Sequence, residues 1–128
     1  MTKRKLKTLI TTKLKKINAI IISNTETDLT VFSARVYVGN YTISVHENTL
    51  GLVTHINLSF GVNMKKKPIP DYICNIYPHE FDTIEDLIDQ IHAKELFANK
   101  DLKHRWWVFK QLQRQVRINF PSRISQHA

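Results

Sequence analysis

The sequence predicts an α+β domain, with an antiparallel three- to four-stranded meander sheet, one N-terminal helix and two C-terminal helices packed mainly on one face. Hydrophobic residues recur every three to four positions near both ends of the chain and alternate with period two in the middle. The chain has 128 residues, 42% of them hydrophobic, and only three glycines and four prolines. We therefore expect a single domain over residues 1–128, with a flexible tail at 122–128.

The first helix is predicted from about Lys3 to Ile22, followed by a polar connection at Ser23–Asp28. Its other face is rich in lysine, so one interpretation is a helix that lies on an anionic membrane surface. The more ordinary interpretation is a helix whose apolar stripe covers a sheet. That stripe consists of Leu6, Leu9, Ile10, Leu14, Ile17, Ile20 and Ile21.

Two strands are predicted after Leu29, joined by a two-residue turn at Gly39-Asn40 that tolerates positive φ. One strand places Phe32, Ala34, Val36 and Val38 on a single face, and the next does the same with Tyr41, Ile43 and Val45. Pairing Val38 with Tyr41 makes every cross-strand pair on this face apolar, as a half-buried sheet requires.

A third strand follows the connection Glu47–Gly51, because apolar and polar residues alternate again from Leu52 to Val62. Asn63–Pro70 holds three lysines and two prolines and is predicted to be an exposed loop. The short apolar run Tyr72–Tyr77 is predicted to be a fourth strand at the edge of the sheet.

Two helices are predicted to end the domain. Asp82 and Glu85 have the spacing of a capping box, so a helix should start there, with its acidic residues in the first turns. We expect a break at Asn99–Asp101 and a last helix from about Leu102 to Ile118, which Pro121 prevents from continuing.

The charge is unevenly distributed. Residues 1–70 hold 11 basic and 3 acidic side chains, residues 71–101 hold 2 and 8, and residues 102–128 hold 6 and 0. The net charge of +8 favours a polyanionic partner, although the acidic block could neutralise part of it by docking between the basic ones. No apolar run approaches the ~20 residues of a membrane span, and one cysteine cannot form an internal disulfide. We expect a cytoplasmic protein with no integral membrane association.

The last helix is the strongest functional candidate. At 100° per residue, Leu102, Trp106, Phe109, Gln113 and Val116 share a core-facing arc, and the opposite arc is basic and aromatic. Cations neutralise phosphates and an exposed indole stacks on unpaired bases, so we predict a small non-enzymatic protein that binds DNA or RNA. The predicted contacts are Lys103, Trp107, Lys110, Arg114 and Arg117, with Lys65, Lys66 and Lys67 as an auxiliary patch.

Three alternatives stay open. Trp107 could lie under the N-terminal helix or the tail and stack there with a neighbouring cation. The same helix, or the acidic helix at 82–92, could instead bind a protein, making the chain an inhibitor or assembly factor. The abundance of Lys, Asn and Ile is compatible with an AT-rich mobile element, in which either role is plausible. The oligomeric state is left open.

The third alternative is a phosphodiesterase on the polar face of the sheet. If Val45 paired with Thr54, then Arg35, Ser44 and His55 would form a row in which the imidazole acts as acid or base and the guanidinium binds the phosphate. Solvated sheet faces carry such residues without any activity. No spacing of histidine, cysteine or carboxylate predicts a metal site, and no glycine-rich loop predicts a cofactor.

Overall fold

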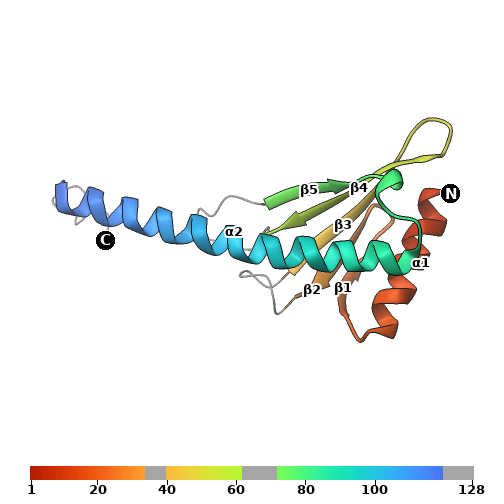
Figure 1. Cartoon of the computed structure of the whole chain (residues 1–128), viewed down its shortest axis with the longest axis horizontal. Helices are drawn as coiled ribbons and strands as arrows, with labels where there is room; N and C mark the ends of the chain where they lie inside the picture. The colour runs from red at the N-terminus through yellow and green to blue at the C-terminus, as the bar shows by residue number, and fades with distance from the viewer. Residues whose placement is uncertain (34–39, 62–71, 120–128) are drawn as a thin grey trace.

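The described residues form a five-stranded antiparallel sheet with two α-helices and one 3₁₀ helix, which confirms the predicted α+β class (Figure 1). The computed structural model describes residues 1–33, 40–61 and 72–119. Its strands follow one another in chain order, so β1 and β5 are the edges of the sheet. The elements are α1 (Lys3–Lys16), β1 (Ile20–Asn24), β2 (Asp28–Phe32), β3 (Asn40–Glu47), β4 (Val53–Phe60), β5 (Tyr72–Ile76), the 3₁₀ helix η1 (Pro78–Glu80) and α2 (Ile84–Asn119).

The core lies between one face of the sheet and the two helices. Alternate residues of the central strands point into it, as the period-two pattern predicted, while the described residues of the opposite face are exposed or half-buried. Both helices add apolar residues to the same cluster, so they cover the same face. Members that are at most 2% exposed are Leu6, Ile10, Leu14, Leu29, Val31, Tyr41, Ile43, Ile56, Leu58, Phe60, Ile76, Leu87, Ile91, Ala98 and Leu102.

The first helix is shorter than predicted, because it ends at Lys16 and the next residues form β1. Asn18 has a φ of 62°, the left-handed conformation that commonly ends helices. The backbone N–H groups of Asn18 and Ala19 donate to the carbonyls of Lys15 and Leu14, at 3.1 and 3.0 Å. These two bonds satisfy the last helical carbonyls, and the β-branched run Ile20–Ile22 then favours a strand.

The predicted register of the first hairpin is wrong. Tyr41 pairs with Val31, and Ile43 pairs with Leu29, so the two-residue turn at Gly39-Asn40 does not join these strands. The inward phase of β2 is that of Leu29 and Val31, whereas Phe32 on the other phase is 43% exposed. Apolar residues occupy both phases of the sequence 29–38, so alternation alone could not select between them. Residues 34–39 lie outside the described part of the chain.

The two predicted C-terminal helices are one helix, α2, which continues through Asn99–Asp101. Asn, Lys and Asp cost a helix well under 1 kcal/mol each, and none of them is Gly or Pro. Ala98 and Leu102 on either side are both buried, so packing carries the helix through this segment. The predicted edge strand at 72–77 is confirmed as β5.

Helix α2 is much longer than the sheet. Its 36 residues correspond to ~54 Å of helix, whereas the longest strands of eight residues span ~27 Å. One half of α2 therefore packs on the sheet and the other half projects beyond it, away from α1 and the N-terminus (Figure 1). We call residues 103–119 the projecting half of α2.

Candidate nucleic-acid interface

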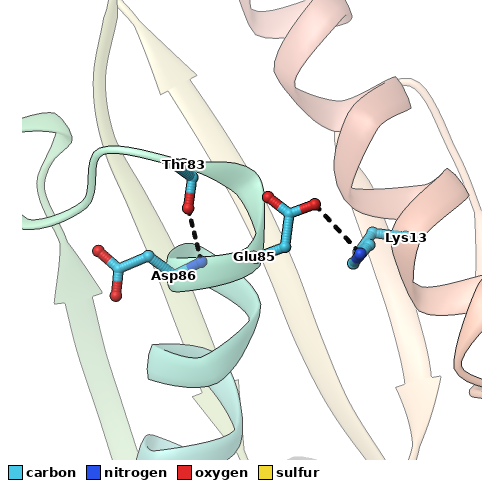
Figure 2. Close-up of polar contacts among 4 residues, drawn as sticks. All are labelled: Lys13, Thr83, Glu85 and Asp86. Atoms are coloured by element: carbon cyan, nitrogen blue, oxygen red, sulfur yellow. Dashed lines mark hydrogen bonds and ion pairs between the residues drawn. The ribbon is translucent and has the colours of Figure 1, made fainter.

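The first turn of α2 is fixed by a cap and by an ion pair to α1 (Figure 2). Thr83 Oγ1 accepts a hydrogen bond from the N–H of Asp86 at 3.1 Å, and the Asp86 carboxylate accepts from the N–H of Asp82 at 3.4 Å. The predicted capping box of Asp82 and Glu85 is therefore not formed: Thr83 caps the helix, and the Asp86 carboxylate bonds to Asp82. Glu85 instead accepts a hydrogen bond from Lys13 Nζ at 3.1 Å.

The ion pair joins α1 to α2 at the end of the molecule opposite the projecting half. Glu85 lies in the first turn of α2, and a hydrogen bond from its own backbone N–H is the main cause that lowers its pKa. The Lys13 ammonium lowers that pKa further. Part of the acidic segment is thus neutralised by α1, at a distance from the cations of the projecting half.

A buried polar contact fixes the middle of α2 to the sheet. Glu95 is 5% exposed, and its carboxylate accepts a hydrogen bond from Ser33 Oγ at the end of β2. Two residues later, the ring of Phe97 contacts that of Tyr72 on β5 at a centroid distance of 5.4 Å. The helix is therefore anchored to both β2 and β5 just before it leaves the sheet.

Beyond Leu102, the described side chains of α2 are exposed, apart from the half-buried Val108. Trp107 is 58% exposed and Leu112 is 61% exposed. The imidazole of His104 lies one turn before Trp107, with the two rings 6.5 Å apart and nearly parallel. The indole is therefore not covered by α1, which packs at the other end of α2.

Four of the predicted contact residues are brought together on one stripe of the projecting half. Lys103, Trp107, Lys110 and Arg114 are all exposed and fall within ~60° of one another around the helix axis. This arc is centred roughly 110° around the helix axis from buried Leu102, so it lies to one side of the buried stripe and not directly opposite to it, as the sequence analysis had placed it. The side chain of Arg117 and the whole of Lys65, Lys66 and Lys67 lie outside the described part of the chain.

The core-facing arc predicted for the last helix is only partly confirmed. Leu102 is buried, but Gln113, assigned to the same arc, is exposed because none of the described strands extends beneath the projecting half. The side chains of Trp106, Phe109 and Val116 lie outside the described residues. The prediction assumed that the whole segment 102–118 would pack on the sheet. Of its described residues, Leu102 is the one that is buried there.

The row of Arg35, Ser44 and His55 is not formed, because the assumed register is wrong. Val45 pairs with Ile56, which places Ser44 opposite Asn57 and His55 opposite His46. Ser44 Oγ donates a hydrogen bond to the carboxylate of Asp28 on β2. Arg35 itself lies outside the described residues. The geometry required for the phosphodiesterase alternative is therefore absent between Ser44 and His55.

The true register instead builds a row of rings that the sequence analysis missed. His46 and His55 stack at 4.5 Å with an interplanar angle of 10°, and Tyr77 and His79 continue the row at centroid distances of 6.2 and 5.9 Å. The row lies at the end of the sheet where β3 ends, away from the projecting half. Only the pairing of β3 with β4 could have identified it.

Groups of three or more histidine, cysteine, aspartate or glutamate side chains able to hold a metal ion are not found among the described residues. Cys74 is half-buried on β5, and this burial raises the pKa of its thiol. Within the described ranges, no helix is both long and apolar enough to span a membrane.

Comparisons with protein-family models, with curated proteins and with solved structures found no match for this chain.

Proposed function

We propose that the protein binds nucleic acid through the projecting half of α2. The observation that carries this proposal is an indole, that of Trp107, held 58% exposed among cations on a helix that extends beyond the fold. Lys103, Lys110 and Arg114 are exposed on the same stripe. Cations supply the affinity for a phosphate backbone, and the indole supplies a flat apolar surface on which an unpaired base can stack.

The charge of this segment favours a polyanion over a second copy of the chain. The sequence holds six basic and no acidic residues after Asp101, so the projecting half has no carboxylate of its own to neutralise it. Two projecting halves placed side by side would bring like charges together, which opposes self-association. A phosphate backbone would be attracted by the same charges.

Lys65, Lys66 and Lys67 lie outside the described part of the chain, between Gly61 and Tyr72. Gly61 and Tyr72, the described residues on either side of the segment that contains Lys65–Lys67, are at the end of the sheet from which α2 projects. This supports retaining the three lysines in the proposal as additional phosphate contacts.

The test is a fluorescence anisotropy titration of labelled single-stranded and duplex oligonucleotides over a range of salt concentrations. With about five phosphate contacts, the slope of log K against log salt should be about −4 to −5 on duplex DNA and about −3.5 on single strands. Affinity that does not change with salt would contradict the proposal.

One double variant and one matched double control locate the interface. Lys103→Ala combined with Arg114→Ala should make the slope shallower by about 2 on duplex DNA, since each substitution removes one phosphate contact. Lys5→Ala combined with Lys16→Ala removes the same charge from exposed positions of α1 and should leave the slope unchanged. Equal effects of the two pairs would show that binding depends on total charge and not on the projecting half.

Trp107→Ala tests stacking separately from charge. It should weaken binding to single strands by about 1 to 3 kcal/mol and binding to duplex by much less, because paired bases are not available to the indole. Phe32→Ala removes another partly exposed aromatic ring, on the sheet, and should leave both affinities unchanged. Equal losses on single strands and duplex in Trp107→Ala would argue against stacking.

A protein partner is the second candidate, and the exposure of Leu112, at 61%, is the observation that favours it. Trp and Arg are enriched where proteins bind one another, and the exposed leucine adds apolar area on another face of the same helix. Absence of binding to every oligonucleotide, together with stoichiometric co-purification of one protein, would favour this function over the first.

A further inference from the structure

A second candidate site lies at the other end of the molecule, in a groove beside α1. The groove has a volume of about 890 Å³, within the range of small-molecule sites. One wall is the face of α1 that points away from α2, and the other is the turn between β1 and β2 with Glu47 at the end of β3. The α1 wall is held in place by the buried residues Leu6, Ile10 and Leu14 on its opposite side.

Three cations line the groove at the start of α1. Lys3, Arg4 and Lys7 belong to its first turns, where the helix dipole is positive, and the first turn holds no acidic residue. Among the described residues, no hydrogen bond or ion pair engages their side-chain nitrogens. Lys3 and Lys7 are half-buried, so their aliphatic stems pack on the protein while their charges stay available. This end of the groove suits a phosphate group.

The rest of the groove holds one further cation, Lys15, about two turns after Lys7 on α1, and otherwise polar or acidic residues. The hydroxyls of Thr8 and Thr11 donate to the carbonyls of Arg4 and Lys7 at 2.9 and 2.8 Å, which leaves their oxygens able to accept hydrogen bonds. On the opposite wall, the carboxylates of Glu26 and Glu47 are further acceptors. Two carboxylates would repel a ligand that is anionic along its whole length, but they would accept hydrogen bonds from neutral hydroxyl groups.

The described lining residues include no aromatic or aliphatic side chain, so the Arg4 guanidinium is the only planar group that the lining offers to a nucleobase. We infer that this groove binds a phosphorylated sugar, with the phosphate at Lys3, Arg4 and Lys7 and the sugar hydroxyls between the α1 threonines and the two glutamates. The site does not depend on nucleic-acid binding, because it lies at the opposite end of the molecule from the projecting half.

The test is a titration of the ¹⁵N-labelled full chain with glucose 6-phosphate, glucose and inorganic phosphate, followed by amide chemical shifts. Glucose 6-phosphate should shift the amides of α1 and of the β1–β2 turn, and it should bind at least about fivefold more tightly than phosphate or glucose alone. Lys7→Ala should weaken it about tenfold, the effect of one charge-assisted hydrogen bond. Glu47→Gln should reduce the advantage of glucose 6-phosphate over phosphate.

Lys5→Ala is the matched control, because Lys5 is on the same turn of α1 but does not line the groove. It should change the affinity less than about twofold, within what a distant surface charge contributes. An equal loss in Lys5→Ala and Lys7→Ala, equal affinities for phosphate and glucose 6-phosphate, or no saturable shifts at about 10 mM probe would overturn the inference. Trp107→Ala should leave this titration unchanged, which separates it from the test of nucleic-acid binding.

Discussion

The contact between Ser33 and Glu95 is expected to be energetically coupled, because both side chains are buried. Ser33 is 4% exposed and Glu95 is 5% exposed, and the serine hydroxyl donates to the carboxylate across the boundary between β2 and α2. Removing one partner leaves the other in a poorly solvated place. Removing both partners leaves no polar group of this pair unsatisfied.

The expected changes in the free energy of unfolding follow from this difference between removing one partner and removing both. Ser33→Ala deletes a hydrogen bond to a charged group and should lower the free energy of unfolding by about 1.5 to 3 kcal/mol. Glu95→Leu removes the acceptor of this hydrogen bond from a buried site and should cost about 1 to 3 kcal/mol. The double variant should be about as stable as the wild type, since replacing a buried polar pair by apolar groups is often neutral or stabilising. The coupling energy should therefore be about 2 kcal/mol or more.

Urea denaturation followed by circular dichroism measures all four proteins. With a slope of 1 to 3 kcal/mol per molar, a loss of about 2 kcal/mol moves the midpoint by roughly 1 M, which is readily resolved. Ser59→Ala, a half-buried serine on the opposite face of the sheet, is the control and should cost no more than about 0.5 kcal/mol. Additive losses in the double variant would refute the reasoning, because they would show that the two side chains do not share one interaction.

Three further predictions follow from burial and ionisation. Leu14→Ala, in the core, should cost about 2 to 5 kcal/mol in urea denaturation, whereas Leu112→Ala at 61% exposure should change stability by less than about 0.5 kcal/mol; similar losses would mean that the projecting half is packed. Because the Glu85 pKa is lowered on folding, its stabilising effect should be present above the ordinary glutamate pKa and lost as the pH falls through the lowered value. Carboxyl NMR titration of Lys13→Ala should move that pKa only part of the way back, since the backbone hydrogen bond remains, and a complete return would contradict this order of causes. The raised pKa of Cys74 should make iodoacetamide labelling at pH 8 slower in the folded than in the urea-unfolded protein, and equal rates would count against burial of the thiol.

The sequence predicted those parts of the fold that depend on local pattern. Each correct prediction rests on a signal contained in one short segment of sequence. These predictions are the alternation in β3 and β4, the edge strand β5 and the helix start near Asp82. The errors arose where two local patterns were both acceptable. Ile20–Ile22 fits the stripe of a helix as well as a strand, and only the chain reversal at Asn18 decides between them. The register of β2 on β3 likewise depends on which face packs against α1 and α2, and that is a tertiary property.

The candidate interface likewise combines features that the local sequence predicts with features that depend on the tertiary structure. The exposure of Trp107 agrees with helical geometry, which places position 107 ~140° around the axis from buried Leu102. That the helix projects beyond the sheet could not be predicted, since this depends on continuity through Asn99–Asp101 and on the length of the strands. The groove beside α1 is still harder to foresee, because its walls are segments that the sheet brings together.

The continuity of α2 also decides how the acidic and basic segments interact. A break at Asn99–Asp101 would allow the basic helix to fold back onto the acidic turns and lose much of its field. In an unbroken helix, Arg114 lies ~20 Å along the axis from Asp101, the last carboxylate in the sequence, and farther from all the others on α2. This is more than twice the Debye length of about 8 Å at physiological salt, so those carboxylates hardly screen the outer cations. The rigidity of one helix, more than the net charge of the chain, is therefore what leaves the projecting half available to a polyanion.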